Sequence, residues 1–372
     1  MLKAAIIGCG KVADAHAEQI RRIPGCELVA ACDRELLMAQ QLADRFPIRS
    51  AYSDAAEMLE KAKPDVVHIT TPPASHLPLS RLCLEAGCHA YIEKPFALDA
   101  AETAGILRLA REKGLKVVAG HNHQFTPAMR RMRALVAAGY LGGAPLHIET
   151  YYGYELARSG YAGALLGDAA HWVRRLPGGL LQNIISHAVA PIAEYCPDDQ
   201  PRVTALGFTS PLLRAAGEEE IVDELRVIVS SAATTAYLTF SSQMRPSLHA
   251  VRLYGPKNGL VVDQDQQTVL RLPGVHRKSY LEKFISPVAT GRQHFTGAAA
   301  NVRRFLRHEL HMSGDTYFLI RAFYQAIEAG QPSPISDREI LLTAQIMDDI
   351  FSQLAAQRSA AAAPANAVAA LG

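Results

Sequence analysis

Short apolar segments alternate with amphipathic ones through the first third of the chain. Runs with strand character cover residues 3–8, 26–33, 65–73, 89–95 and 116–122. Between them, apolar residues recur at helical spacing in 14–23, 54–62, 76–87 and 98–114. This alternation is typical of an α/β fold, a doubly wound parallel sheet whose ligands bind at the carboxyl ends of the strands. We therefore expect residues 1–122 to form one such domain.

The pattern changes at about residue 123. A helical segment at 124–139 and a strand at 145–155 are followed by strand runs at 223–231, 234–242, 248–255, 259–264 and 268–272. Consecutive strands joined by short turns indicate a large, mainly antiparallel sheet, and hence a C-terminal α+β domain over residues 123–356. A late helix at 335–357 is expected to pack back on the body. The Ala-rich residues 357–372 are expected to form a disordered tail.

The turn after the first predicted strand reads GCGKVA and places Gly8, Gly10 and Ala13 in a GxGxxA pattern. Small residues let the backbone turn tightly and approach a pyrophosphate, which the N-terminus of the next helix binds through free N–H groups. Asp33 ends the second strand, where its carboxylate can accept a hydrogen bond from a ribose hydroxyl. We expect a Rossmann-type dinucleotide site, with NAD favoured by Asp33. Arg34 can pair with a 2′-phosphate, so NADP remains open.

Further polar side chains follow the later strands of the predicted sheet. Because the carboxyl ends of parallel strands share one edge, these residues are expected to surround the same cofactor. With the glycine turn included, the candidate cofactor-binding residues are Gly8, Gly10, Lys11, Val12, Ala13, Asp33, Arg34, Thr70, Thr71, Pro72, His76, Glu93, Lys94 and Asn122.

Composition narrows the class of protein. The 372 residues are 49% hydrophobic and 20% charged, and the formal net charge of +2 gives no reason to expect nucleic acid or a membrane surface as partner. The six cysteines include no CxxC pair, which argues against a zinc site and a disulfide framework. No cleavable signal segment precedes the first strand, and no apolar run is long enough to span a bilayer. We expect a cytoplasmic protein without a bound metal.

The segment GGLLQNIISH, residues 178–187, is almost entirely apolar and ends on a histidine. In a helix, Asn183 and His187 lie four residues apart on one face. Read alone, the segment favours a buried His187 that is hydrogen-bonded to Asn183. The alternative is that His187 belongs to a proton-transfer site.

Four segments together resemble the Gfo/Idh/MocA family of nicotinamide-dependent oxidoreductases. They read AIIGCGKVADAH, VVHITTPPASH, LEAGCHAYIEKPFAL and GGLLQNIISH. The first three follow the family in order across the whole first domain, and EKP is the most specific motif. The resemblance implies a homo-oligomer, a dimer or tetramer formed through the C-terminal sheet. It does not identify the substrate.

The resemblance also implies three candidate catalytic residues. Lys94, in EKP, would lie beside the nicotinamide and the substrate hydroxyl, where burial would lower its pKa toward neutrality. His187 would face it from the second domain, with Asn183 orienting the imidazole. The family usually has an aspartate in place of Asn183 and a glycine in place of Ile185, so we expect His187 to be less basic here. Gln124 stands where relatives often carry an arginine.

Residues 151–187 contain the candidates for substrate recognition. An aromatic face suits stacking on the C–H surface of a sugar, and an arginine can bind a phosphate or a carboxylate. The alternatives are that the tryptophan fills a gap in the core and that the arginine is an ordinary surface residue. The candidate substrate-binding residues are Tyr154, Asp168, Trp172, Arg174 and His187.

These observations together favour an NAD(P)-dependent oxidoreductase. It would transfer a hydride between the nicotinamide and a secondary alcohol or ketone of a sugar, polyol or sugar derivative. Two alternatives remain open: an NAD-dependent glycoside hydrolase on the same fold, and a non-catalytic binding protein that responds to a dinucleotide.

Overall fold

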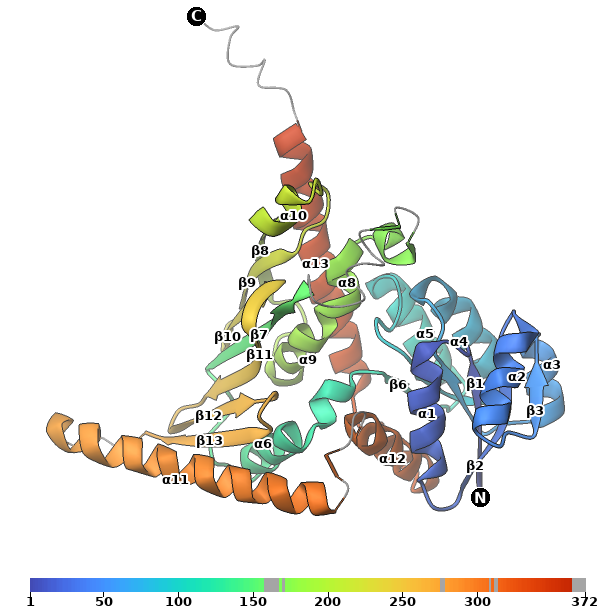
Figure 1. Cartoon of the computed structure of the whole chain (residues 1–372), viewed down its shortest axis with the longest axis horizontal. Coiled ribbons are helices and arrows are strands. Elements are labelled where there is room, and N and C mark those ends of the chain that lie inside the picture. Colours follow the sequence, from blue (N-terminus) through green and yellow to red (C-terminus); the bar gives the residue numbers. More distant parts are fainter. Residues whose placement is uncertain (157–166, 169–170, 275–277, 308, 311–313, 363–372) are drawn as a thin grey trace, which may run out of the picture.

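The first third of the chain forms a parallel sheet of six strands (Figure 1). The computed structural model describes residues 1–156, 167–168, 171–274, 278–307, 309–310 and 314–362. The strands are β1 (Leu2–Ile7), β2 (Cys26–Cys32), β3 (Ser50–Tyr52), β4 (Val66–Ile69), β5 (His89–Ile92) and β6 (Val117–Ala119). Their side chains are almost all buried because helices cover both faces of the sheet, as the uninterrupted apolar runs predict.

The helices of this region are α1 (Lys11–Arg21), α2 (Leu36–Arg45), α3 (Ala55–Ala62), α4 (His76–Glu85) and α5 (Ala100–Glu112). The predicted doubly wound fold is confirmed, although the sequence interpretation assigned neither β3 nor α2. The strand order is β3-β2-β1-β4-β5-β6, so the chain changes direction across the sheet between β1 and β4. Ligands of such sheets bind at this switch point. The predicted glycine turn leaves β1 here, beside the end of β4.

The second sheet has seven strands in the order β13-β12-β11-β7-β10-β9-β8. They are β7 (His147–Glu155), β8 (Arg202–Phe208), β9 (Glu224–Ser230), β10 (Thr235–Ser241), β11 (Gln243–Tyr254), β12 (Asn258–Asp263) and β13 (Thr268–Pro273). All neighbours are antiparallel except β7 and β10. The mainly antiparallel sheet is therefore confirmed, with β8 as a strand that the sequence interpretation did not assign.

Helices of the second half cover one face of this sheet and join it to the first. They are α6 (Pro127–Ala137), α8 (Gly179–Ile184), α9 (Ser186–Tyr195), α10 (Pro211–Ala215), α11 (Ser279–Leu306), α12 (Gly314–Glu328) and α13 (Asp337–Ala362). The predicted helix over 178–187 is divided at Ile185 into α8 and α9. In Figure 1, α13 runs between the two sheets, and it contacts α9, β8 and α5.

The last part of the chain departs from the sequence interpretation in two ways. No helix was expected for α11 or α12, yet α12 returns to the first sheet, where Leu319, Ile320 and Phe323 are buried in the same core as β1 and β4. Residues 357–362 continue α13 where a disordered tail is expected, and residues 363–372 lie outside the described part. The domain boundaries at 122 and 356 stay predictions.

Within the described residues, no helix has the length and apolar composition needed to cross a bilayer.

Candidate functional site

The glycine turn presses the end of β1 against the end of β4. Gly8 has φ of +96°, and a Cβ placed on it would lie 2.6 Å from Cγ2 of Thr71 and 2.9 Å from the carbonyl carbon of Thr70. Only glycine combines this backbone conformation with such close approach. A Cβ on Gly10, in contrast, would meet nothing within 4 Å. Gly10 precedes the first turn of α1, so the open space lies at a helix N-terminus, where an anion can be bound.

Asp33 lies beside this turn, at the end of β2. Its Oδ2 accepts a hydrogen bond of 2.8 Å from the backbone N–H of Cys9, and its Oδ1 accepts one of 3.0 Å from that of Glu35. The carboxylate is thereby fixed in orientation, and each oxygen keeps a lone pair for a further donor. Arg34 is exposed next to it. Lys11 and Val12 are exposed at the start of α1, whereas Ala13 is buried.

Hydrogen bonds join the turns that follow β1, β4 and β5. The Thr70 hydroxyl donates to the Gly8 carbonyl at 2.6 Å. The His76 ring contacts the Thr71 carbonyl at 2.8 Å and the Pro95 carbonyl at 3.0 Å. Burial lowers the pKa of His76. Most of the residues predicted to bind the cofactor thus share one edge of the sheet, as the parallel topology requires.

Lys94 extends from the end of β5 toward the second domain. Its Nζ donates a hydrogen bond of 2.8 Å to the main-chain carbonyl of Asn183 and lies 3.5 Å from the Asn183 side-chain oxygen. Burial lowers the pKa of Lys94, and the charge of Glu93 opposes this shift. A lysine held in this way can exchange a proton closer to neutral pH than an exposed one.

Glu93 extends into the interior beneath this lysine. Its Oε1 lies 2.9 Å from Nε2 of His16, and its Oε2 accepts a hydrogen bond of 3.1 Å from the Lys94 main-chain N–H. Gly120 leaves room for the carboxylate, since a Cβ there would lie 2.9 Å from Oε1. Burial raises the pKa of Glu93, but the hydrogen bond from His16 and the positive charge of Lys94 outweigh this effect, so the pKa is lowered overall.

His187 faces the same region from α9. Its ring stacks on that of His123 with centroids 3.9 Å apart. Burial, together with the charges of His123 and Lys94, lowers the pKa of His187 well below its ordinary value. Within the described part of the chain, its Nδ1 has no hydrogen-bond partner. Asn183 contacts Lys94 through its main-chain and side-chain oxygens, and the expectation that it orients His187 stays a prediction.

His123, Tyr152 and His249 are not among the individual site residues predicted from the sequence. Tyr152 of β7 lies opposite His249 of β11 in the second sheet, and their rings are 4.4 Å apart. Nδ1 of His249 lies 2.7 Å from Oδ1 of Asp265. The position of His123 could have been predicted, because it follows a strand of the parallel sheet. His249 was not, because only the register of β7 and β11 brings it to Tyr152.

The remaining candidate substrate-binding residues lie in several different surroundings. Arg174 forms an ion pair of 2.8 Å with Glu218, and Trp172 stacks on His171 with 36% of its surface exposed. The ring of Tyr154 packs against Phe240 at 6.2 Å. Asp168 is exposed, next to residues 157–166 and 169–170, which lie outside the described residues.

Two polar residues after β6 are bound elsewhere in the fold. The amide of Asn122 donates to Asp315 at 2.9 Å, at the start of α12. The amide of Gln124 donates to Glu194 at 3.1 Å, which also pairs with Arg133. Neither contact involves Lys94.

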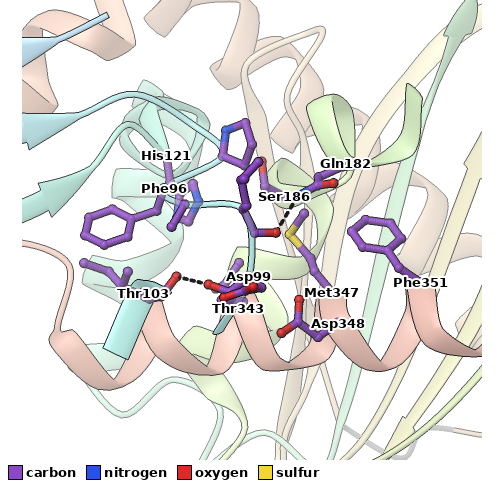
Figure 2. Close-up of a pocket in the computed structure, with 15 residues that line it drawn as sticks. Phe96, Asp99, Thr103, His121, Gln182, Ser186, Thr343, Met347, Asp348 and Phe351 are labelled. Carbon is purple, nitrogen blue, oxygen red and sulfur yellow. Dashed lines mark hydrogen bonds between the residues drawn. The ribbon is translucent and has the colours of Figure 1, made fainter. Parts of the chain in front are cut away.

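Figure 2 shows a pocket beside Phe96 and Asp99, in the segment that follows β5. Its walls come largely from α13 and from residues 95–99 after β5, and Gln182 crosses it to donate to the Leu98 carbonyl at 2.7 Å. Within the described residues, His121 Nδ1 and Ser186 Oγ on its wall are buried without hydrogen-bond partners. Two such groups in a mainly apolar pocket suit bound water rather than a polyhydroxylated molecule. Across the same part of the chain, no group of three or more His, Cys, Asp or Glu residues has a metal-binding arrangement.

Comparison with known proteins agrees with this geometry. Residues 2–121 match the family described as oxidoreductase family, NAD-binding Rossmann fold, which is the Gfo/Idh/MocA family. The match covers the region of the first sheet. The resemblance seen in the sequence is thus confirmed.

Among curated relatives, D-glucoside 3-dehydrogenase of Escherichia coli is 37% identical over 142 residues, which cover 38% of this chain and 40% of that protein. D-apiose dehydrogenase of Paraburkholderia graminis is 33% identical over 140 residues, which cover 38% of this chain and 37% of that protein. The chain therefore spans about two fifths of the length of these relatives.

Solved structures extend the likeness to the whole fold. An NAD-binding oxidoreductase from Klebsiella pneumoniae superposes with a TM-score of 0.77 at 19% identity, covering 96% of this chain and 97% of that one. The WlbA dehydrogenase from Bordetella pertussis, in complex with NADH and UDP-GlcNAcA, gives 0.74 at 14% identity, covering 96% of each chain. At these identities the likeness shows the fold alone.

Proposed function

We propose that this protein is an NAD(P)-dependent oxidoreductase acting on a secondary alcohol or ketone of a sugar, polyol or sugar derivative. The observation that carries the proposal is the position of Lys94. It is a half-buried lysine at the same sheet edge as the glycine turn and Asp33, and it extends toward the histidines of the second domain. When bound, the nicotinamide would exchange a hydride with the substrate carbon, and the chain itself would manage the proton.

The open N-terminus of α1 and the fixed carboxylate of Asp33 fit a dinucleotide. Gly10 leaves space for a pyrophosphate, and Asp33 can accept a hydrogen bond from a ribose hydroxyl. The Asn183 carbonyl orients the Lys94 amine, which in its neutral form would accept the proton of the substrate hydroxyl during oxidation. Neutral imidazoles at His123 and His187 would give hydrogen bonds to hydroxyl groups without adding charge.

The proposed substrate class has two supports. The relatives named D-glucoside 3-dehydrogenase and D-apiose dehydrogenase match this chain over 142 and 140 residues. The wall opposite Lys94 is built from imidazole and phenol groups of His123, Tyr152 and His187, which suit hydroxyl groups better than an anionic or purely apolar substrate.

A substrate panel tests this function. Sugars, glycosides, inositols and nucleotide sugars are each incubated with NAD or NADP, and reduced cofactor and products are quantified. We expect at least one member to give reduced cofactor and ketone in equal amounts. Cleavage of a glycoside without net reduction would instead support the hydrolase. Tight binding of NADH without any reaction across the panel, in either direction, would favour a binding protein.

We expect NADH to bind more tightly than NADPH, because the Asp33 carboxylate accepts from the ribose hydroxyl and repels a 2′-phosphate. Asp33→Asn keeps an acceptor and removes the charge, so the ratio of NADPH to NADH affinity should rise about tenfold or more. Fluorescence titration with both cofactors measures it. Asp14→Asn, which removes an exposed carboxylate from α1, is the control and should leave the ratio unchanged. Tighter NADPH binding by the unmodified protein would contradict the role of Asp33.

We also propose a homo-oligomer formed through the open face of the second sheet. Ile228 and Tyr237 are cross-strand neighbours on β9 and β10 and are 43% and 49% exposed, an apolar pair that a second copy can cover. The double variant Ile228→Glu, Tyr237→Glu should reduce the mass measured by light scattering to that of a monomer. Leu37→Glu, at an exposed apolar residue of α2, should not. A monomeric unmodified protein would rule out this assembly.

A further inference from the structure

A line of hydrogen-bonded side chains runs from the candidate site through the core of the first sheet. Glu93 Oε1 lies 2.9 Å from His16 Nε2, and His16 Nδ1 lies 2.8 Å from His68 Nδ1. His68 Nε2 in turn lies 2.8 Å from the Tyr324 hydroxyl. The four residues come from the end of β5, from α1, from β4 and from α12, so only the folded chain brings them together.

The line is shielded from solvent. His16, His68 and Tyr324 are 1%, 0% and 2% exposed, and the ring of Tyr91 stacks on His68 at 4.7 Å. Beyond Tyr324 lies the thiol of Cys26, at the start of β2. The line therefore connects the carboxyl edge of the sheet, where the candidate site lies, with its amino edge. Buried polar groups of this kind are costly unless each donor meets an acceptor.

The order of donors and acceptors gives the line a direction. A phenol keeps its proton, and burial raises the pKa of Tyr324 well above its ordinary value. The neighbouring thiol is a weak acceptor, so the Tyr324 hydroxyl donates to His68 Nε2. Neutral His68 then carries its proton on Nδ1 and donates to His16 Nδ1. If His16 accepts this hydrogen bond on Nδ1, its proton is on Nε2, which donates to Glu93.

We propose that Tyr324, His68 and His16 act as positioning residues that keep Glu93 ionised beside Lys94 and so set the pH at which Lys94 exchanges its proton. This inference rests on the proposed role of Lys94 in proton transfer. These three residues transfer no proton. Their hydrogen bonds place the N–H of His16, rather than a lone pair, beside the Glu93 carboxylate. If the direction of the line were reversed, His16 would present a lone pair, and Glu93 would have to bind a proton.

Other ionisable groups also act on these two residues. The groups around Glu93, from α1, β5, α4, the segment after β6 and α12, are His16, Tyr91, Lys94, His76, His121 and Asp315. The groups whose charges interact with that of Lys94 are Glu93, His121, His123 and His187. None of them besides His16 donates to Glu93 Oε1 in the described residues, so the line alone controls that oxygen.

The direction can be measured without substrate. In the full chain with ¹⁵N-labelled histidine, ¹⁵N shifts and two-bond couplings report which ring nitrogen carries the proton, and single variants assign the two rings among the 14 histidines. We expect His68 as the Nδ1–H form and His16 as the Nε2–H form. The opposite tautomers, or an imidazolium at either ring, would overturn the proposal even if the protein proves to be an active dehydrogenase.

The effect on Lys94 is tested with Tyr324→Phe. Without the hydroxyl, the line loses its directing donor and Glu93 can bind a proton. Loss of that negative charge disfavours the Lys94 ammonium, so the rising limb of kcat/KM against pH should move to lower pH by about half a unit or more. Tyr317→Phe is a matched control on the same helix, because Tyr317 stacks under Arg22 outside the line.

A merely structural role predicts a different result for Tyr324→Phe. Stability or kcat would fall at all pH values without movement of the limb, and this outcome would overturn the proposal. If the protein shows no turnover on any substrate, the proposed function fails, while the histidine tautomers of the unmodified chain still test the line of hydrogen bonds on its own.

Discussion

Replacing Lys94 with alanine should lower kcat about a hundredfold or more while NADH binding stays within a fewfold of the original. A side chain placed to transfer a proton contributes on the order of 10²- to 10⁴-fold to the rate. Lys94 is a half-buried amine at the carboxyl edge of the sheet, and its Nζ donates a hydrogen bond of 2.8 Å to the Asn183 carbonyl. Stopped-flow kinetics and fluorescence titration of the same preparations separate the two quantities.

Lys94→Arg distinguishes proton transfer from simple charge. Arginine keeps the positive charge but does not release its proton, so this variant should be about as slow as Lys94→Ala. In the original protein, kcat/KM for alcohol oxidation should rise with pH as Lys94 loses its proton. Because burial lowers the pKa of Lys94, the inflection should lie below 10.5, and it should vanish in both variants. Near-normal turnover by either variant would remove Lys94 from the mechanism.

The cofactor side of this site could be read from the sequence because its signals are local. The glycine turn, Asp33 and Lys94 each follow a strand, and a parallel sheet brings the ends of its strands to one edge. The sequence predicts neither the break between α8 and α9 at Ile185 nor the hydrogen bond between Lys94 and Asn183. That pairing depends on how two domains approach each other, which periodicity does not encode.

The substrate side and the buried line depend on long-range packing. His249 reaches Tyr152 only through the register of β7 and β11. His68 looks like one more residue of an apolar strand until α12 returns and places Tyr324 at 2.8 Å from it. The partners in each contact, β7 with β11 and β4 with α12, are far apart in the chain, so no local pattern could have linked their side chains.

Gly8→Ala should lower the stability of the protein, whereas Gly10→Ala should lower its affinity for NADH, although the two glycines are only two residues apart. At Gly8, with φ of +96°, a methyl group would lie 2.6 Å from Thr71 Cγ2 and 2.9 Å from the backbone of Thr70. Strain and overpacking of this kind cost about 1–3 kcal/mol each, so Tm should fall by several degrees with or without NADH. Thermal unfolding followed by circular dichroism measures this.

At Gly10 the same methyl group would meet nothing within 4 Å, and the backbone, with φ of −78°, is extended and suits any residue. Tm without cofactor should therefore not change. A pyrophosphate bound at this helix N-terminus would collide with the methyl group, so NADH affinity should fall about tenfold or more. Gly105→Ala, in α5 with equally open space, is the control for both and should leave affinity intact. Unchanged NADH affinity in Gly10→Ala would mean that the dinucleotide binds elsewhere, whereas unchanged stability in Gly8→Ala would mean that the β1–β4 contact can relax.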